Sequence, residues 1–177
     1  KLDRPFLVLA TQNPLEQEGT YPLPEAQMDR FMFKLHVDYP SKSDELEIVN
    51  RMGKNDKHEI QPVITREELM RASDRVDMIY VDQKVKNYIV EIVMATGKPS
   101  DYGLSNIDHL ISVGGSPRAS IALIRAAKAH AFLRARGYVT AEDVKAIAYG
   151  VLRHRLILTY EAEAENIKSD QMVKEIL

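Results

Sequence analysis

One asparagine stands where its side chain could position a ligand or a water molecule. Residues 6–10, FLVLA, are all apolar, which is typical of a strand buried on both faces in a parallel sheet. The run ends in Thr11, Gln12 and Asn13, and Pro14 cannot continue a hydrogen-bonded ladder. Because ligands of open α/β sheets bind at the carboxyl ends of strands, the Asn13 amide could orient a ligand or an attacking water. The same residue could instead close the strand with an Asx turn.

An arginine at the start of a helix is a second candidate. Ser116 and Pro117 predict an N-cap and a first helical residue. The helix should run to about Arg136 and end with Gly137 as its C-cap. Arg118 would then lie in the first turn, where the helix dipole disfavours a positive charge. A nearby anion such as a phosphate group would offset this, and an Arg118 side chain lying along the bundle surface is the alternative.

The elements that would carry these residues are mostly helices. Capping residues and apolar stripes predict a short helix start at Pro24, helices that begin after Ser41 or Ser43, Thr65, Asp82, Ser116 and Thr140, and a final helix over residues 171–177. The later part of residues 31–37 predicts a second strand. Glu161, Glu163 and Glu165 are interpreted as the solvated edge of an extended stretch. Five or so helices with short connections would bury one another's apolar stripes in a small bundle.

Composition excludes several classes of protein. The 177 residues suit one domain, or a fragment plus a small domain, and 45% of them are hydrophobic, enough for a packed core. Without cysteine the chain has neither disulfides nor thiolate metal sites, and no apolar run is long enough to predict a transmembrane helix. A formal charge of −2 argues against general nucleic-acid binding. No metal site is assigned, because metal-ligand spacing is lacking among His36, His58, His109 and His130.

Several sequence blocks resemble the MoxR family of AAA+ ATPases. ATQNP at residues 10–14, followed by EQEGTYPLPEAQMDRF at 16–31, is similar to the sensor-1 and arginine-finger block of that family. GGSPRA at 114–119 resembles its sensor-2 motif, and LRHRL at 152–156 and LTYEAEAENI at 158–167 are also similar to the family. The resemblance spans nearly the whole chain. It implies a mainly α fold, with a helical AAA+ lid bundle preceded by a short α/β remnant of the AAA+ core.

The resemblance implies a role for each candidate residue. Asn13 would be sensor 1, which orients the water that attacks the γ-phosphate. Arg30 would be the arginine finger, which stabilises charge on the γ-phosphoryl group of a nucleotide in the neighbouring subunit. An always-charged, forked guanidinium suits that task, and the alternative is a local ion pair of Arg30 with Asp29 or Glu25. Arg118 would be sensor 2, next to the nucleotide phosphates.

The family resemblance also implies partners and cofactors. The intact protein would bind ATP and Mg²⁺, form a homo-oligomeric ring, usually a hexamer, and remodel or help assemble other proteins in the cytoplasm. Clients with von Willebrand A domains are implied as a possibility, and neither a membrane segment nor nucleic acid is expected. Residues 1–40 would be the C-terminal remnant of the core, and residues 41–177 the lid.

The phosphate-binding loop of an AAA+ protein is missing from this sequence. That loop has the pattern G-x-x-x-x-G-K-[ST], because backbone N–H groups and a lysine cradle the phosphates. Gly53 and Lys54 are followed by Asn55, and Gly97 and Lys98 are followed by proline. We therefore expect the Walker A and Walker B motifs upstream of Lys1, and we expect this chain to be inactive alone.

Two other interpretations of the basic helices stay open. Arginine and lysine but no acid occur on the helix after Ser116, at positions Arg118, Arg125, Lys128, Arg134 and Arg136. This could indicate a helix-turn-helix regulator of nucleic acid, or a solvated face that meets acidic neighbours in a non-catalytic interaction module. Arg153, His154 and Arg155 follow a helix C-terminus, where cations are favoured, so capping is the simplest interpretation for them.

Overall fold

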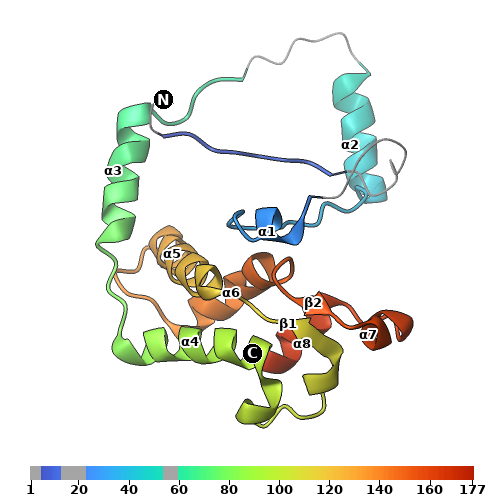
Figure 1. The fold of residues 1–177 in the computed structure, drawn as a ribbon. Coiled ribbons are helices and arrows are strands. Elements are labelled where there is room, and N and C mark those ends of the chain that lie inside the picture. Colours follow the sequence, from blue (N-terminus) through green and yellow to red (C-terminus); the bar gives the residue numbers. More distant parts are fainter. Residues whose placement is uncertain (1–4, 13–22, 54–59) are drawn as a thin grey trace.

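The computed structural model describes residues 5–12, 23–53 and 60–177, and most of these residues are helical (Figure 1). The α-helices are α1 (Glu25–Met28), α2 (Lys42–Met52), α3 (Arg66–Asp77), α4 (Gln83–Gly97), α5 (Pro117–Leu133), α6 (Ala141–Leu152), α7 (Tyr160–Ala164) and α8 (Ser169–Ile176). Two 3₁₀ helices, η1 (Pro99–Tyr102) and η2 (Asp108–Leu110), follow α4, and the strands are β1 (Ile111–Val113) and β2 (Ile157–Leu158). The predicted mainly α fold is confirmed.

The helices begin where local side-chain chemistry places them. The predicted N-caps Ser41, Thr65, Asp82, Ser116 and Thr140 each directly precede a helix. At the start of α3 the Thr65 hydroxyl accepts the Glu68 amide at 3.1 Å, while the Glu68 carboxylate accepts the Thr65 amide at 2.8 Å. Such a capping box satisfies backbone donors that have no partner within the helix.

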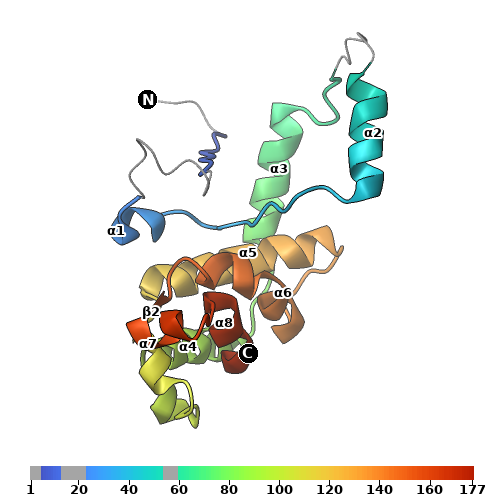
Figure 2. The same ribbon diagram turned by 90° about the vertical axis from the view of Figure 1, so that its right-hand side faces the viewer.

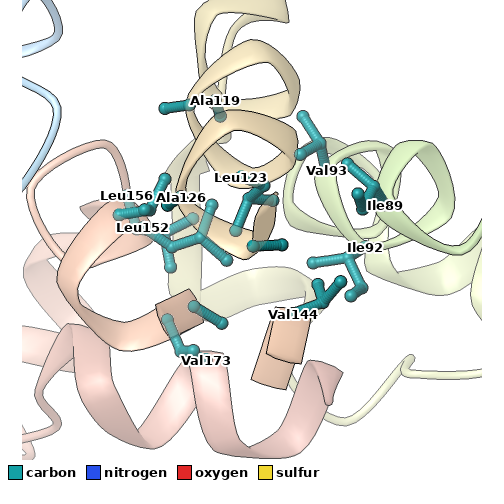
Figure 3. Packing of buried hydrophobic residues seen from close by; sticks show 14 of the residues in the cluster. Ile89, Ile92, Val93, Ala119, Leu123, Ala126, Val144, Leu152, Leu156 and Val173 are labelled. Atoms are coloured by element: carbon teal, nitrogen blue, oxygen red, sulfur yellow. The ribbon is translucent and has the colours of Figure 1, made fainter. Parts of the chain in front are cut away.

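The core lies between α4, α5, α6 and α8 (Figure 3). The inner face of α5 is built mainly from small residues, namely Ala119, Ala122, Ala126, Ala127 and Ala131, together with Leu123, and all of them are buried. Larger side chains from the surrounding helices pack against this face, among them Ile89, Ile92, Val144, Leu152 and Val173. The small side chains let α4 and α6 approach α5 closely, so that one helix serves as the centre of the bundle.

Two helices extend away from this bundle. α2 and α3 rise on one side of it in both views, and α3 contacts α5 (Figures 1 and 2). The predicted apolar face of α2 is exposed, with Leu46, Ile48, Val49 and Met52 all 49% or more accessible to solvent. α2 therefore contributes no buried residue to the core.

A two-stranded antiparallel sheet joins the chain after η2 to the chain after α6. Ile111 pairs with Leu158, and Val113 pairs with Ile157. The Thr159 amide continues the contact by donating to the Leu110 carbonyl at 3.0 Å. The sequence indicated only a loop with a short apolar segment there, because a three-residue strand is too short to show a period.

The strand predicted at Phe6–Ala10 does not form, and neither does the strand predicted near residues 33–37. Residues 5–12 lie without regular secondary structure, and the side chains from Phe6 to Leu9 are 61–83% exposed. A strand is defined by hydrogen bonds to a partner, and the described part of the chain offers no sheet edge to this segment.

Hydrogen exchange should separate this segment from a nearby one that is anchored. In a dilute monomer of this chain the amides of Phe6–Ala10 should exchange quickly. The Lys34 amide should be protected, because it donates to the Gly150 carbonyl at 2.8 Å. Strong protection of Phe6–Ala10 under these conditions would contradict the structure, whereas protection that develops only at high concentration would indicate strand pairing between chains.

Two further local predictions were wrong. α5 ends at Leu133, and the left-handed residue beyond it is Ala135, with φ 55°, rather than Gly137. The Arg136 amide reaches back to the Ala131 carbonyl at 2.9 Å, a bond that requires the left-handed turn one residue earlier.

The acidic stretch after β2 is helical rather than extended. Glu161 and Glu163 lie in the first turn of α7, where acids complement the helix dipole, and Glu165 is its C-cap. The Thr159 hydroxyl accepts the Ala162 amide at 3.3 Å, and Ala162 is fully buried. Five residues are too few to show a helical period, so alternating glutamates imitated a strand.

Candidate functional site

The three predicted site residues differ in how far the structure places them. Asn13 lies outside the described residues. Arg30 follows α1 in a tight turn, in which its amide donates to the Gln27 carbonyl at 3.2 Å, and its side chain is exposed. Arg118 is the second residue of α5, and its side chain is 61% exposed.

The start of α5 is fixed by two glycines that precede it. A Cβ atom on Gly114 would lie 2.5 Å from backbone atoms of Thr96 and Gly97, so only glycine fits against the end of α4. The Gly115 amide donates to the Thr96 hydroxyl at 2.7 Å. This close contact explains the glycine pair of the GGSPRA block and sets the position of Arg118 three residues later.

Asp29 joins Arg118 to the turn that carries Arg30. Arg118 Nη1 donates to Asp29 Oδ2 at 3.1 Å, and the Ser116 hydroxyl donates to the same oxygen at 3.0 Å. Arg155 Nε donates to Asp29 Oδ1 at 3.0 Å. The anion that offsets the unfavourable position of Arg118 on the helix dipole is thus supplied by a carboxylate of the chain itself.

The Asp29 carboxyl group is ionised more readily than an isolated one. Burial raises its pKa, but the hydrogen bonds from Ser116 and Arg118 and the charge and hydrogen bond of Arg155 lower it by more. The resulting pKa lies below the usual aspartate value. Asp29 pairs with Arg118 and Arg155, whereas the sequence interpretation had considered a pair between Asp29 and Arg30.

Arg155 holds the backbone of the same turn. Its side chain is only 3% exposed, and its Nη2 donates to the carbonyls of Asp29 at 3.0 Å and Phe31 at 2.7 Å. Its Nη1 donates to the Met32 carbonyl at 3.3 Å and to the Val151 carbonyl in α6. The bond to Val151 is the helix capping that the sequence indicated, and the remaining bonds attach residues 29–32 to the end of α6.

The neighbours of Arg155 complete this attachment. His154 Nε2 lies 3.1 Å from the Phe31 carbonyl, so this nitrogen carries the proton and donates. Burial is the main cause that lowers the pKa of His154, which favours its neutral form. Gly150 permits close approach, because a Cβ atom there would lie 3.0 Å from the Phe33 ring.

Other charged clusters of the bundle have structural partners. Asp143 is fully buried and accepts hydrogen bonds from Thr140, Arg136 and His130, which tie the end of α5 to the start of α6. Burial raises the pKa of Asp143, but these hydrogen bonds, above all those from Arg136, bring it far below the usual value. Arg153 binds Asp170 through two bonds of 3.0 Å, which attach α8 to the end of α6.

The basic residues of α5 do not form an unpaired recognition surface. Arg118 binds Asp29, Arg136 binds Asp143, and the Lys128 ammonium donates to the Asp77 carbonyl at 2.7 Å. Much of the positive charge is thus committed to contacts within the chain. This weakens the helix-turn-helix interpretation, in which these side chains would face phosphates of nucleic acid.

Two searches of the described residues returned nothing. Within residues 5–12, 23–53 and 60–177, no group of three or more His, Cys, Asp or Glu side chains could hold a metal ion. No helix in that part of the chain is long and apolar enough to cross a membrane.

Sequence reasoning missed Asp29 and Arg155 as parts of the site. The LRHRL block marked Arg155, but its partner lies 126 positions earlier in the sequence. Asp29 stands next to Arg30 and was considered only as its local partner. A helix C-terminus indicates capping, and no pattern within either segment reveals that they meet.

Comparisons with known proteins agree with this arrangement. Residues 104–176 match the family model described as the AAA lid domain, and residues 1–33 match that of the ATPase family associated with various cellular activities. These two matches define the class, an AAA lid bundle preceded by part of an AAA module.

The similar proteins narrow the class further. "Chaperone MoxR1" of Mycobacterium tuberculosis is 43% identical over 98% of this chain and 46% of its own length. "Protein MoxR" of Methylorubrum extorquens is 28% identical over 92% of this chain and 51% of its own length. A crystal structure of a candidate ATPase from Cytophaga hutchinsonii is 47% identical, with a TM-score of 0.94 over 99% of this chain and 53% of that one.

The chain belongs to the MoxR family of AAA+ ATPases and corresponds to the C-terminal part of such a protein. It spans about half the length of the curated relatives that it matches.

Proposed function

We propose that the intact protein hydrolyses Mg-ATP and uses the cycle to remodel or assemble partner proteins. One observation carries this proposal: an exposed arginine at the start of α5 and an exposed arginine after α1 are held about a single carboxylate, Asp29. Two guanidinium groups fixed on rigid supports are suited to bind the anionic oxygens of a transferring phosphoryl group. The family supports ATP as the source of that group.

Each site residue has a proposed part in this reaction. Arg118 contacts the phosphates, because its exposed, always-charged guanidinium fits an anionic ligand. Arg30 stabilises charge on the γ-phosphoryl group held by a neighbouring subunit, and the Asn13 amide orients the attacking water. Magnesium, when bound, neutralises charge on the phosphates. Since the described residues contain no cluster of metal ligands, its ligands are proposed to come from the rest of a longer protein.

The assembly follows from the finger. A finger that acts on a neighbour's nucleotide requires a closed ring of subunits, and six is the number we propose. Residues 1–40 are proposed as the end of the AAA core and residues 41–177 as the lid. The bonds of Arg155 to residues 29–32 cross that boundary and couple the two parts. Clients in the cytoplasm, among them proteins with von Willebrand A domains, are the proposed substrates of the remodelling.

This chain by itself should not hydrolyse ATP. It lacks a G-x-x-x-x-G-K-[ST] loop, and positioning of the phosphates supplies nearly all of the catalysis in phosphoryl transfer. Phosphate release should therefore stay at the background rate for the 177-residue chain and rise well above it for the full-length protein. Turnover by the purified chain that disappears in Arg30→Ala would contradict the proposal, as would an inactive full-length protein.

A further inference from the structure

Asp29 is the point at which two arginine-bearing segments meet. Its two carboxylate oxygens accept hydrogen bonds from Arg118 at 3.1 Å and Arg155 at 3.0 Å, and Ser116 donates to the oxygen that Arg118 uses. Asp29 is 17% exposed, so most of its contact surface is occupied by these partners. The carboxylate therefore connects α1, α5 and the end of α6.

The two arginine partners of Asp29 differ in how firmly they are held. Arg155 is 3% exposed and also binds four backbone carbonyls, so it cannot leave without breaking all of these bonds. Arg118 is 61% exposed and has one hydrogen bond to Asp29. A guanidinium binds carboxylate and phosphate through the same forked geometry, so a phosphate group can compete with Asp29 for Arg118.

Arg30 directly follows Asp29 in the chain. The carbonyls of Asp29 and Phe31, on either side of Arg30, are both held by Arg155. The Arg30 side chain itself is exposed. A shift of the Asp29 carboxylate is thus transmitted to Arg30 through a single peptide unit, whose planarity leaves few ways to absorb it.

We propose that Asp29 is a positioning residue that couples the contact of Arg118 to the placement of Arg30. When Arg118 exchanges the Asp29 carboxylate for a nucleotide phosphate, the turn at residues 29–32 changes its position and carries Arg30 with it. A nucleotide bound by one subunit thereby sets the finger that the same subunit offers to its neighbour. This inference rests on the proposed ATPase function.

The test uses Asp29→Asn in the full-length protein. Asparagine keeps the shape of the side chain but removes the charge that competes for Arg118. ATP should bind about fivefold or more tightly, in the range typical of coupled sites. Turnover at saturating ATP should fall by roughly tenfold or more, because Arg30 is no longer placed. General damage to the fold would instead weaken binding and turnover together.

A matched control is available at the same end of α6. Asp170 also binds an arginine through two bonds of 3.0 Å, but that arginine is Arg153 and has no bond to Asp29. Asp170→Asn should change neither ATP affinity nor saturating turnover by more than about twofold. In an Arg118→Ala background the affinity gain of Asp29→Asn should disappear, because the competing partner is gone.

Hydrogen exchange provides a second test that does not require Asp29→Asn to fold. It compares full-length Arg30→Ala, which removes the direct contact with the neighbour, and Arg30→Ala with Arg118→Ala. A non-hydrolysable ATP analogue should change exchange at residues 29–34 in the first protein and not in the second. Both substituted side chains are exposed, so both proteins should fold.

The outcomes distinguish this inference from the proposed function. If wild-type protein hydrolyses ATP but Asp29→Asn behaves like Asp170→Asn, the inference is wrong and the proposed function stands. The inference is also wrong if the affinity gain persists without Arg118, or if the analogue changes residues 29–34 equally in both exchange samples. If the wild-type protein neither binds nor hydrolyses ATP, the proposed function fails, and the inference fails with it.

Discussion

Replacing Arg30 by alanine in the full-length protein should leave ATP binding nearly unchanged and lower turnover by roughly 10³-fold or more. The exposed Arg30 side chain contributes no buried packing, so its loss should not disturb the lid. The loss of turnover would arise because no other guanidinium stabilises the charge that develops on the transferring phosphoryl group in the neighbouring subunit.

Mixed rings can show whether Arg30 acts on a neighbouring subunit. Subunits with Arg30→Ala are combined with subunits disabled in the phosphate loop that the full-length protein is proposed to carry. Each defective subunit can supply what the other lacks, so mixed rings should recover part of the turnover that both parents have lost.

The possible results of the mixing experiment separate three roles for Arg30. Recovery of turnover supports action in the neighbouring subunit. If mixing restores nothing while both parents are inactive, Arg30 acts on the nucleotide of its own subunit. If the Arg30→Ala parent retains near-normal turnover, Arg30 has only a local structural part, and the proposed finger is wrong.

Arg155→Ala should lower the free energy of unfolding of this chain by about 3 kcal/mol or more. The substitution removes an almost fully buried guanidinium and leaves the Asp29 carboxylate and several backbone carbonyls without their donor. Denaturant unfolding at neutral pH measures the change, provided that one cooperative transition is seen.

Two variants serve as controls for Arg155→Ala. Arg153→Ala removes a neighbouring arginine whose partner Asp170 is 42% exposed, and it should cost only about 1 kcal/mol. Arg155→Lys should not restore the stability, because one ammonium cannot reach the acceptors that the guanidinium fork binds. Equal losses for Arg153→Ala and Arg155→Ala would show that Arg155 does not have the role described above.

The parts of this fold that the sequence predicts well depend on contacts between near neighbours. Thr65 and Glu68 reveal the start of α3 because they bond across three residues. Leu123 and the alanines of α5 repeat at helical spacing, so their buried face is also readable. The end of α5 was misplaced because Ala135 adopts a conformation usually left to glycine.

The parts that the sequence does not predict depend on distant contacts. The apolar run at Phe6–Ala10 has the composition of a strand, but strand formation requires a partner edge that composition does not specify. The pairs that Asp29 makes with Arg118 and Arg155 span 89 and 126 positions. Arg30 and Arg118 could be nominated only through the family resemblance, because an isolated exposed arginine has no periodic signal.

The alanine face of α5 has a mechanical consequence for the lid. With α4 and α6 packed closely on it, α5 cannot slide or tilt separately, since close-packed interiors resist small displacements. A 17-residue helix is about 25 Å long, so a rotation of roughly 10° about its first turn would carry its far end by roughly 4 Å. α5 would then work as a lever with its fulcrum beside Asp29, converting a sub-ångström exchange of partners at Arg118 into a displacement large enough for a client or an adjacent subunit to feel.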